Sequence, residues 1–105
     1  MATVRDIFPE FSDELVRLVQ SSARPELADQ IPSLPVVDRC GCGQSNCALF
    51  YTAPRPSGAY GPGHSNVLLD PKKGLIVLDV VEGRVVAVEV LDRPDVKRRL
   101  DAGLS

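Results

Sequence analysis

The sequence predicts an α+β domain in which N-terminal helices pack on a small antiparallel sheet that ends in a long β-hairpin, followed by a short C-terminal helix. Two β-branched runs, residues 75–81 and 84–91, flank the dipeptide Glu82-Gly83, and this glycine can supply the positive φ of a tight turn. Apolar residues recur at helical spacing near the N-terminus, and a proline suits the first turn of a last helix over residues 94–102. A chain of 105 residues has the length of one domain.

The N-terminal helical part is expected over residues 11–31. Ser12 can cap a first helix, because its hydroxyl can accept a hydrogen bond from a backbone N–H of the first turn. Pro25 suits the first position of a second short helix that ends near Gln30, since the proline lacks an N–H that would have no partner there. The residues expected to face the core from this second helix are Leu27 and Ile31.

The antiparallel sheet is expected over residues 36–92, with the hairpin as its last part. Its earlier strands are expected at residues 36–39, 47–52 and 67–69. The tight turn places Val81 opposite Arg84. Regular pairing from there places Val77 opposite Val88, and both faces of the hairpin are then mainly apolar. A sheet with one face in water would instead alternate apolar and polar residues.

Composition and charge argue against several classes of protein. The chain has 12 Lys and Arg residues against 14 Asp and Glu, a formal net charge of −2, so it lacks the basic excess that binds nucleic-acid phosphates. No stretch approaches the ~20 apolar residues of a membrane span, and residues 1–10 lack the apolar core of a secretory signal. The three cysteines are an odd number within residues 40–47, which favours a reducing cytoplasm over a secreted disulfide scaffold. We expect a cytoplasmic protein.

A glycine-rich cysteine turn, Cys40-Gly-Cys-Gly-Gln-Ser-Asn-Cys47, is a candidate zinc site. Structural zinc takes four ligands, most often thiolate or imidazole, so Cys40, Cys42 and Cys47 would need one more. The candidates are His64 and Asp70. If strands at residues 47–52 and 66–70 paired, Cys47 and His64 would lie roughly 16 Å apart at ~3.3 Å per residue, which favours Asp70. A ligand from a second subunit is a further alternative.

Two other interpretations of the cysteine turn stay open. The cysteines can be small, partly buried residues of a tight turn, or Cys47 can pair with Cys40 or Cys42 in a redox reaction. The spacing C-x-C-x4-C resembles the post-SET zinc motif of histone methyltransferases, over eight residues. That resemblance implies a metal-binding turn and no methyltransferase activity. Zinc is the only cofactor that the sequence suggests.

A loop rich in glycine and proline, residues 53–65, is a second candidate site. Arg55, Tyr60 and His64 are the candidate ligand-binding residues, and His64 can act as an acid or base near neutral pH. The sequence indicates no partner that would orient the His64 ring. The alternative is a surface loop with Tyr60 packed back on the domain.

The hairpin region, residues 74–92, resembles the closing hairpin of small bacterial domains of unknown function, in which G-R-I-V-G-I-E-I-L-D follows an acidic or glycine turn. The resemblance spans about 19 of the 105 residues. It implies a bacterial-type protein with this hairpin and brings no catalytic residues.

From these patterns we expect a non-catalytic interaction or accessory domain that forms a homodimer through the hairpin sheet, residues 75–91. Both apolar faces of the hairpin need to be shielded from water, and the predicted helices can shield only one of them. Asp79 and Glu89 lie on these apolar faces and must reach an edge, a cation or a partner. The alternatives are a domain held by structural zinc and a small enzyme or ligand binder that uses Tyr60 and His64. Neither nucleic acid nor membrane is an expected partner.

Overall fold

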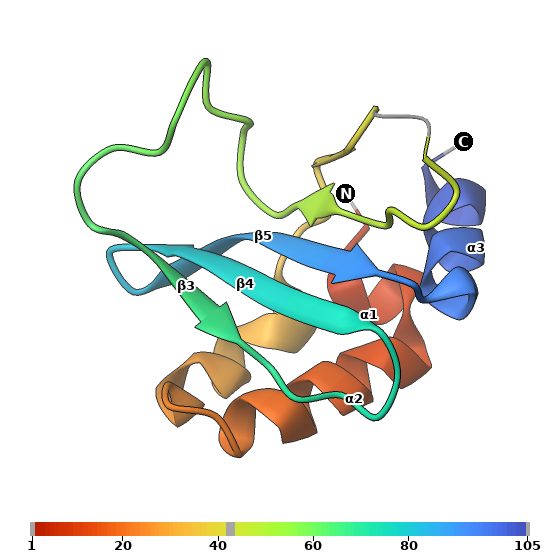
Figure 1. Cartoon of the computed structure of the whole chain (residues 1–105), viewed down its shortest axis with the longest axis horizontal. Coiled ribbons are helices and arrows are strands. Elements are labelled where there is room, and N and C mark those ends of the chain that lie inside the picture. Colours follow the sequence, from red (N-terminus) through yellow and green to blue (C-terminus); the bar gives the residue numbers. More distant parts are fainter. Residues whose placement is uncertain (1, 42–43, 105) are drawn as a thin grey trace.

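The computed structural model describes residues 2–41 and 44–104, and it has the predicted α+β fold. Within these described residues, five strands form one antiparallel sheet in the order β1-β2-β5-β4-β3. These strands are β1 (Asp38–Arg39), β2 (Phe50–Tyr51), β3 (His64–Leu68), β4 (Leu75–Val81) and β5 (Arg84–Leu91). The predicted hairpin is therefore confirmed with its bounds. The helical elements α1, α2 and η1 lie on one face of the sheet, and α3 lies at one end of it (Figure 1).

The helical part begins earlier than the sequence suggested. The elements are α1 (Val4–Ile7), α2 (Pro9–Gln20), the 3₁₀ helix η1 (Pro25–Ser33) and α3 (Pro94–Gly103). Ser12 is not a cap, because it is buried inside α2 and its N–H donates to the Phe8 carbonyl at 2.7 Å. A proline at the first helical position starts α2, as it does η1 and α3.

The core lies between the helices and the sheet. The Phe8 ring stacks on Phe50 of β2 at 5.0 Å and meets the edge of Phe11 at 5.8 Å. Leu27 and Ile31 of η1 are buried in the same cluster, as predicted. Burying such side chains stabilises the fold by roughly 1.5–3 kcal/mol each, so this face of the sheet is committed to the core.

A β-bulge changes the register that we predicted for the hairpin. Glu82 and Gly83 both have positive φ, 50° and 80°, as a two-residue type I′ turn requires, and Val81 pairs with Arg84 as predicted. Beyond the turn, however, Asp79 pairs with Ala87 and Val77 pairs with Glu89, so β5 contains one extra residue. The predicted pairing of Val77 with Val88 is wrong for this reason.

The bulge also changes which side chains share a face. Residues that pair across antiparallel strands project to the same side, so Val88 and Val90 join the core side. Asp79 and Glu89 come to lie together on the other side. The prediction of two apolar faces is therefore wrong: one face is the core, and the other carries two acids.

The hairpin separates the two strands whose pairing we had considered. β2 pairs with β1 and β5, whereas β3 pairs with β4, so residues 47–52 and 66–70 are not neighbours. The chain passes from β2 to β3 by the loop of residues 53–63, which arches over the sheet on the side away from the helices (Figure 1). At its start, Thr52 donates from its N–H to Val86 O at 2.9 Å and from Oγ1 to Val85 O at 2.8 Å. The bulge therefore anchors the loop.

Candidate functional site

A hydrogen-bonded polar cluster lies on the sheet face opposite the helices. It consists of His64 and Asn66 of β3, Asp79 of β4 and Glu89 of β5. Asn66 Nδ2 donates to Asp79 Oδ1 at 2.7 Å, and His64 Nε2 lies 3.0 Å from the same oxygen. Asn66 is directly opposite Asp79 in the β3–β4 register, which explains the short contact. Asp79 is therefore the orienting partner of His64 that sequence reasoning did not find.

Glu89 is the most perturbed acid of this cluster. Burial, followed by a hydrogen bond to Asp79 and the negative charge of Asp79, raises the pKa of Glu89 from 4.5 to about 7, against a smaller opposing effect of His64. Two carboxyl groups that share a site resist double ionisation, so the pair retains a proton near neutral pH. Strongly shifted acids in a concave site are characteristic of functional sites.

The two acids of the cluster form the floor of a pocket beneath the loop of residues 53–63, and His64 and Asn66 lie behind them. The pocket has a volume of about 480 Å³, and Asp79 and Glu89 line it from the sheet. Tyr51 lines it from β2, and Arg55 and Tyr60 line it from the loop. This volume falls within the roughly 300–1,000 Å³ typical of small-molecule pockets.

The structure places two of the three predicted ligand-binding residues, Arg55 and Tyr60, in the lining of this pocket, and it places His64 next to the pocket, against Tyr60 and Asp79. The Tyr60 ring lies against the His64 ring, with centroids 4.7 Å apart. Arg55 Cζ lies 4.8 Å from the centroid of the Tyr51 ring, and its guanidinium is 3.6 Å from Asp38. A binding site at Arg55, Tyr60 and His64 stays a prediction, and the structure supplies the geometry of these three side chains.

The Tyr60 hydroxyl is a further unusual feature of the pocket. Its oxygen is buried and has no hydrogen-bond partner among residues 2–41 and 44–104. Burial and the nearby charge of Asp79 raise the pKa of the phenol, so the group stays neutral. An unsatisfied buried hydroxyl costs free energy, roughly 1–3 kcal/mol, and a ligand atom can recover it.

Sequence reasoning missed Asn66, Asp79 and Glu89 as members of one site. A signal was present, since Asp79 and Glu89 are the two acids inside otherwise apolar strands. Placing both acids on one face requires the extra residue in β5. Without the bulge, regular pairing puts them on opposite faces.

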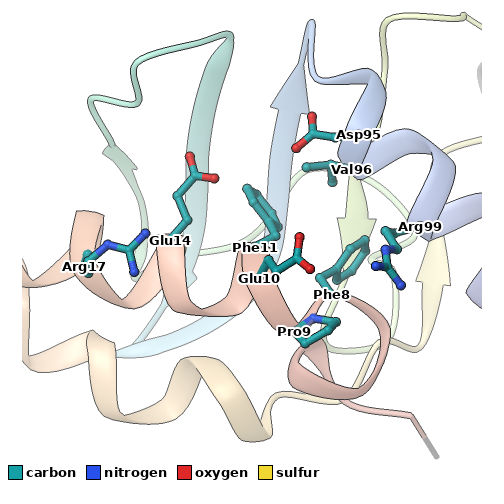
Figure 2. Close-up of a pocket in the computed structure, with 9 residues that line it drawn as sticks. All are labelled: Phe8, Pro9, Glu10, Phe11, Glu14, Arg17, Asp95, Val96 and Arg99. Atoms are coloured by element: carbon teal, nitrogen blue, oxygen red, sulfur yellow. The ribbon is translucent and has the colours of Figure 1, made fainter.

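A second pocket lies between the start of α2 and α3 (Figure 2). It has a volume of about 300 Å³, and Figure 2 shows Glu10 and Glu14 on one side of it and Asp95 and Arg99 on the other. Next to it, Arg93 donates to Glu14 at 2.7 and 2.8 Å and to Asp95 at 3.0 and 3.1 Å. These hydrogen bonds lower the pKa of Asp95. Because Arg93 pairs with both Glu14 and Asp95, we assign this ion-pair network a structural role.

The cysteine turn has only two of its cysteines in the described part of the chain. Cys40 and Cys47 are partly buried, and Cys42 lies outside the described residues. Within residues 2–41 and 44–104, no group of three or more His, Cys, Asp or Glu residues is placed to hold a metal. Asp70 and His64 therefore do not join Cys40 and Cys47 in such a group, and His64 contacts Asp79 instead. Zinc at Cys40, Cys42 and Cys47 stays a prediction.

Comparison with known proteins adds no relative. No family model, no curated protein and no solved structure matches the chain. Among the described residues, no helix is long and apolar enough to cross a membrane.

Proposed function

We propose that the protein is a small-molecule-binding domain and that its site is the pocket between the loop of residues 53–63 and the polar cluster. The observation that carries this proposal is the placement of Asp79, only 6% exposed, at the floor of a pocket with Asn66 and His64 bound to it. A buried carboxylate costs free energy unless it is hydrogen-bonded, and an apolar residue would pack there without that cost.

The cluster is better suited to a ligand than to a purely structural role. A structural cluster is expected to satisfy all its members, whereas Glu89 has a raised pKa and the Tyr60 hydroxyl has no partner in the described chain. Both groups line the pocket. They are therefore available to a bound molecule.

Nuclear magnetic resonance can test this proposal with three probes of similar size and different charge: benzylamine, benzyl alcohol and benzoate. We expect at least one probe to shift the backbone amide signals of Tyr60, Asp79 and Glu89 in a saturable manner. Tyr60→Leu, which removes a wall of the pocket, should weaken the effect, whereas Arg98→Gln on exposed α3 should not. If none of the probes shifts these signals at millimolar concentration, the proposal is wrong.

A homodimer through the hairpin sheet is a second proposal, and one observation supports it. Leu68 and Leu75 are 69% and 44% exposed, and by register both lie with Val77 on the face away from the helices. The strand that contains Leu68, β3, is an edge strand of the sheet, and it has no Lys, Arg or Pro between His64 and Leu68. Natural proteins normally protect such an edge.

Light scattering at micromolar concentration tests the dimer. We expect twice the chain mass for the parent protein and the chain mass for Leu68→Lys, with Arg98→Glu on α3 as the matched surface control. A monomeric parent protein would contradict this second proposal and leave the pocket unaffected.

A further inference from the structure

We propose that the pocket binds a small organic cation, an amine or guanidine attached to a flat apolar group, with Asp79 and Glu89 holding the charged end. This inference rests on the proposed function and names its ligand class.

Among the described residues, the one basic side chain in contact with the acids at the floor of the pocket is His64, which is charged only when protonated. Within residues 2–41 and 44–104, neither Asp79 nor Glu89 forms an ion pair with a lysine or arginine. Asp79 Oδ1 accepts a hydrogen bond from the neutral Asn66 and lies 3.0 Å from His64 Nε2, and the further partner of Asp79 is the other acid, Glu89. Buried carboxylates without a permanent countercharge are costly, so the floor of the pocket favours a bound cation over an anion.

The walls of the pocket suit a cation that carries a flat apolar group. Tyr51 and Tyr60 supply aromatic rings, and the Tyr51 ring already attracts the Arg55 guanidinium at 4.8 Å. Arg55 is itself paired with Asp38 at 3.6 Å, so its charge is partly neutralised. A molecule with a flat apolar group and a positive charge therefore finds aromatic side chains in the walls of the pocket and acids at its floor.

The hydrogen-bond donors of an organic ammonium group also match the acceptors at the floor of the pocket. An ammonium group has three N–H donors and no acceptor. The floor presents the carboxyl oxygens of Asp79 and Glu89, and the buried Tyr60 hydroxyl has no other partner in the described chain. An alcohol or a carboxylate of equal size would satisfy fewer of these acceptors.

Binding of a cation should release a proton from Glu89. The titratable and charged groups around Glu89 are Asp79 of β4, His64 of β3, Tyr51 of β2, and Arg55 and Tyr60 of the loop, and the pKa of Glu89 is about 7. The ammonium takes the place of the carboxyl proton, which passes to solvent. A group of this pKa is about one-eleventh ionised at about pH 6 and ten-elevenths at about pH 8, so we expect about tenfold tighter binding at the higher pH.

The test is a titration of the intact protein with benzylamine, benzyl alcohol and benzoate at about pH 6 and pH 8, followed by the amide signals of the pocket. We expect benzylamine to bind most tightly and to gain about tenfold with pH. Glu89→Gln should weaken its binding about tenfold at about pH 8 and abolish the pH dependence, whereas Glu10→Gln on α2 should change neither.

The possible failures can be told apart. If benzyl alcohol or benzoate binds in the pocket more tightly than benzylamine, the cation inference is wrong and the binding function stands. If no probe binds, both fail. Asp79→Asn is a second variant that removes a negative charge from the floor of the pocket. Circular dichroism shows whether Glu89→Gln and Asp79→Asn are folded. Unchanged benzylamine affinity in both folded variants would overturn the inference.

Discussion

Replacing Glu89 by glutamine should stabilise the protein at alkaline pH and have little effect in acid. The pKa of Glu89 is about 7 in the folded protein against an ordinary 4.5. Between these values the folded protein holds a proton that the unfolded chain has released, so stability falls as the pH rises through this window. Glutamine cannot ionise, and its amide can donate to Asp79 as the protonated carboxyl does.

The size of the effect follows from the pKa difference. A pKa change of one is worth about 1.4 kcal/mol, which gives an upper limit of about 3 kcal/mol once the pH exceeds 7. Glu89 is only partly buried and lines an open pocket, so solvent screening reduces the expected value to about 2 kcal/mol. The free-energy gap between Glu89→Gln and the parent should widen by this amount between about pH 5 and pH 8.5.

Urea unfolding followed by circular dichroism at both pH values measures this gap. Glu10→Gln is the matched control, because Glu10 is exposed on α2, and its gap to the parent should be the same at both pH values. If the Glu89→Gln gap also stays constant, Glu89 ionises normally and our description of the pocket floor is wrong.

Three further predictions concern the rest of the chain. Arg93→Ala removes the paired hydrogen bonds to Glu14 and should lower the free energy of unfolding, measured with urea, by about 2–4 kcal/mol. A decrease below about 0.5 kcal/mol would contradict the structural role of Arg93. Gly74→Ala should lower the free energy of unfolding by more than about 2 kcal/mol, because φ of Gly74 is 75° and the new Cβ would lie 2.4 Å from Leu91 O. The control Gly58→Ala has open space around the new Cβ and should change the free energy of unfolding by less than about 0.5 kcal/mol. Equal effects of the two substitutions would refute this reasoning. The zinc hypothesis for residues 40–47 predicts near-stoichiometric zinc by elemental analysis of protein purified without added metal or chelator, and a clean absence would end it.

The hairpin was predictable because its signals are local. Two β-branched runs and a glycine define both strands and a turn with positive φ, and the structure has these bounds. The bulge was not predictable in the same way, because residues 85–88 are all apolar and no polar side chain marks the face until Glu89. A shift of one residue therefore leaves the apolar pattern intact.

The site was predictable only in part. Tyr60 and His64 stood out as ligand-capable side chains on a long loop, and the structure places their rings together. Their acidic partner Asp79 depends on the pairing of β3 with β4, which no local pattern specifies. The two-residue strand β2 lies between β1 and β5 rather than beside β3, for the same reason. Long-range strand order comes from packing and loop paths, which one sequence does not display.

The most direct test of the pocket floor is a pH titration of the Glu89 side-chain carboxyl carbon by ¹³C nuclear magnetic resonance. Burial and the site shared with Asp79 predict a midpoint near 7 in the free protein and a lower midpoint when benzylamine is bound. A midpoint near 4.5, unchanged by benzylamine, would contradict both the acid pair and its role in binding.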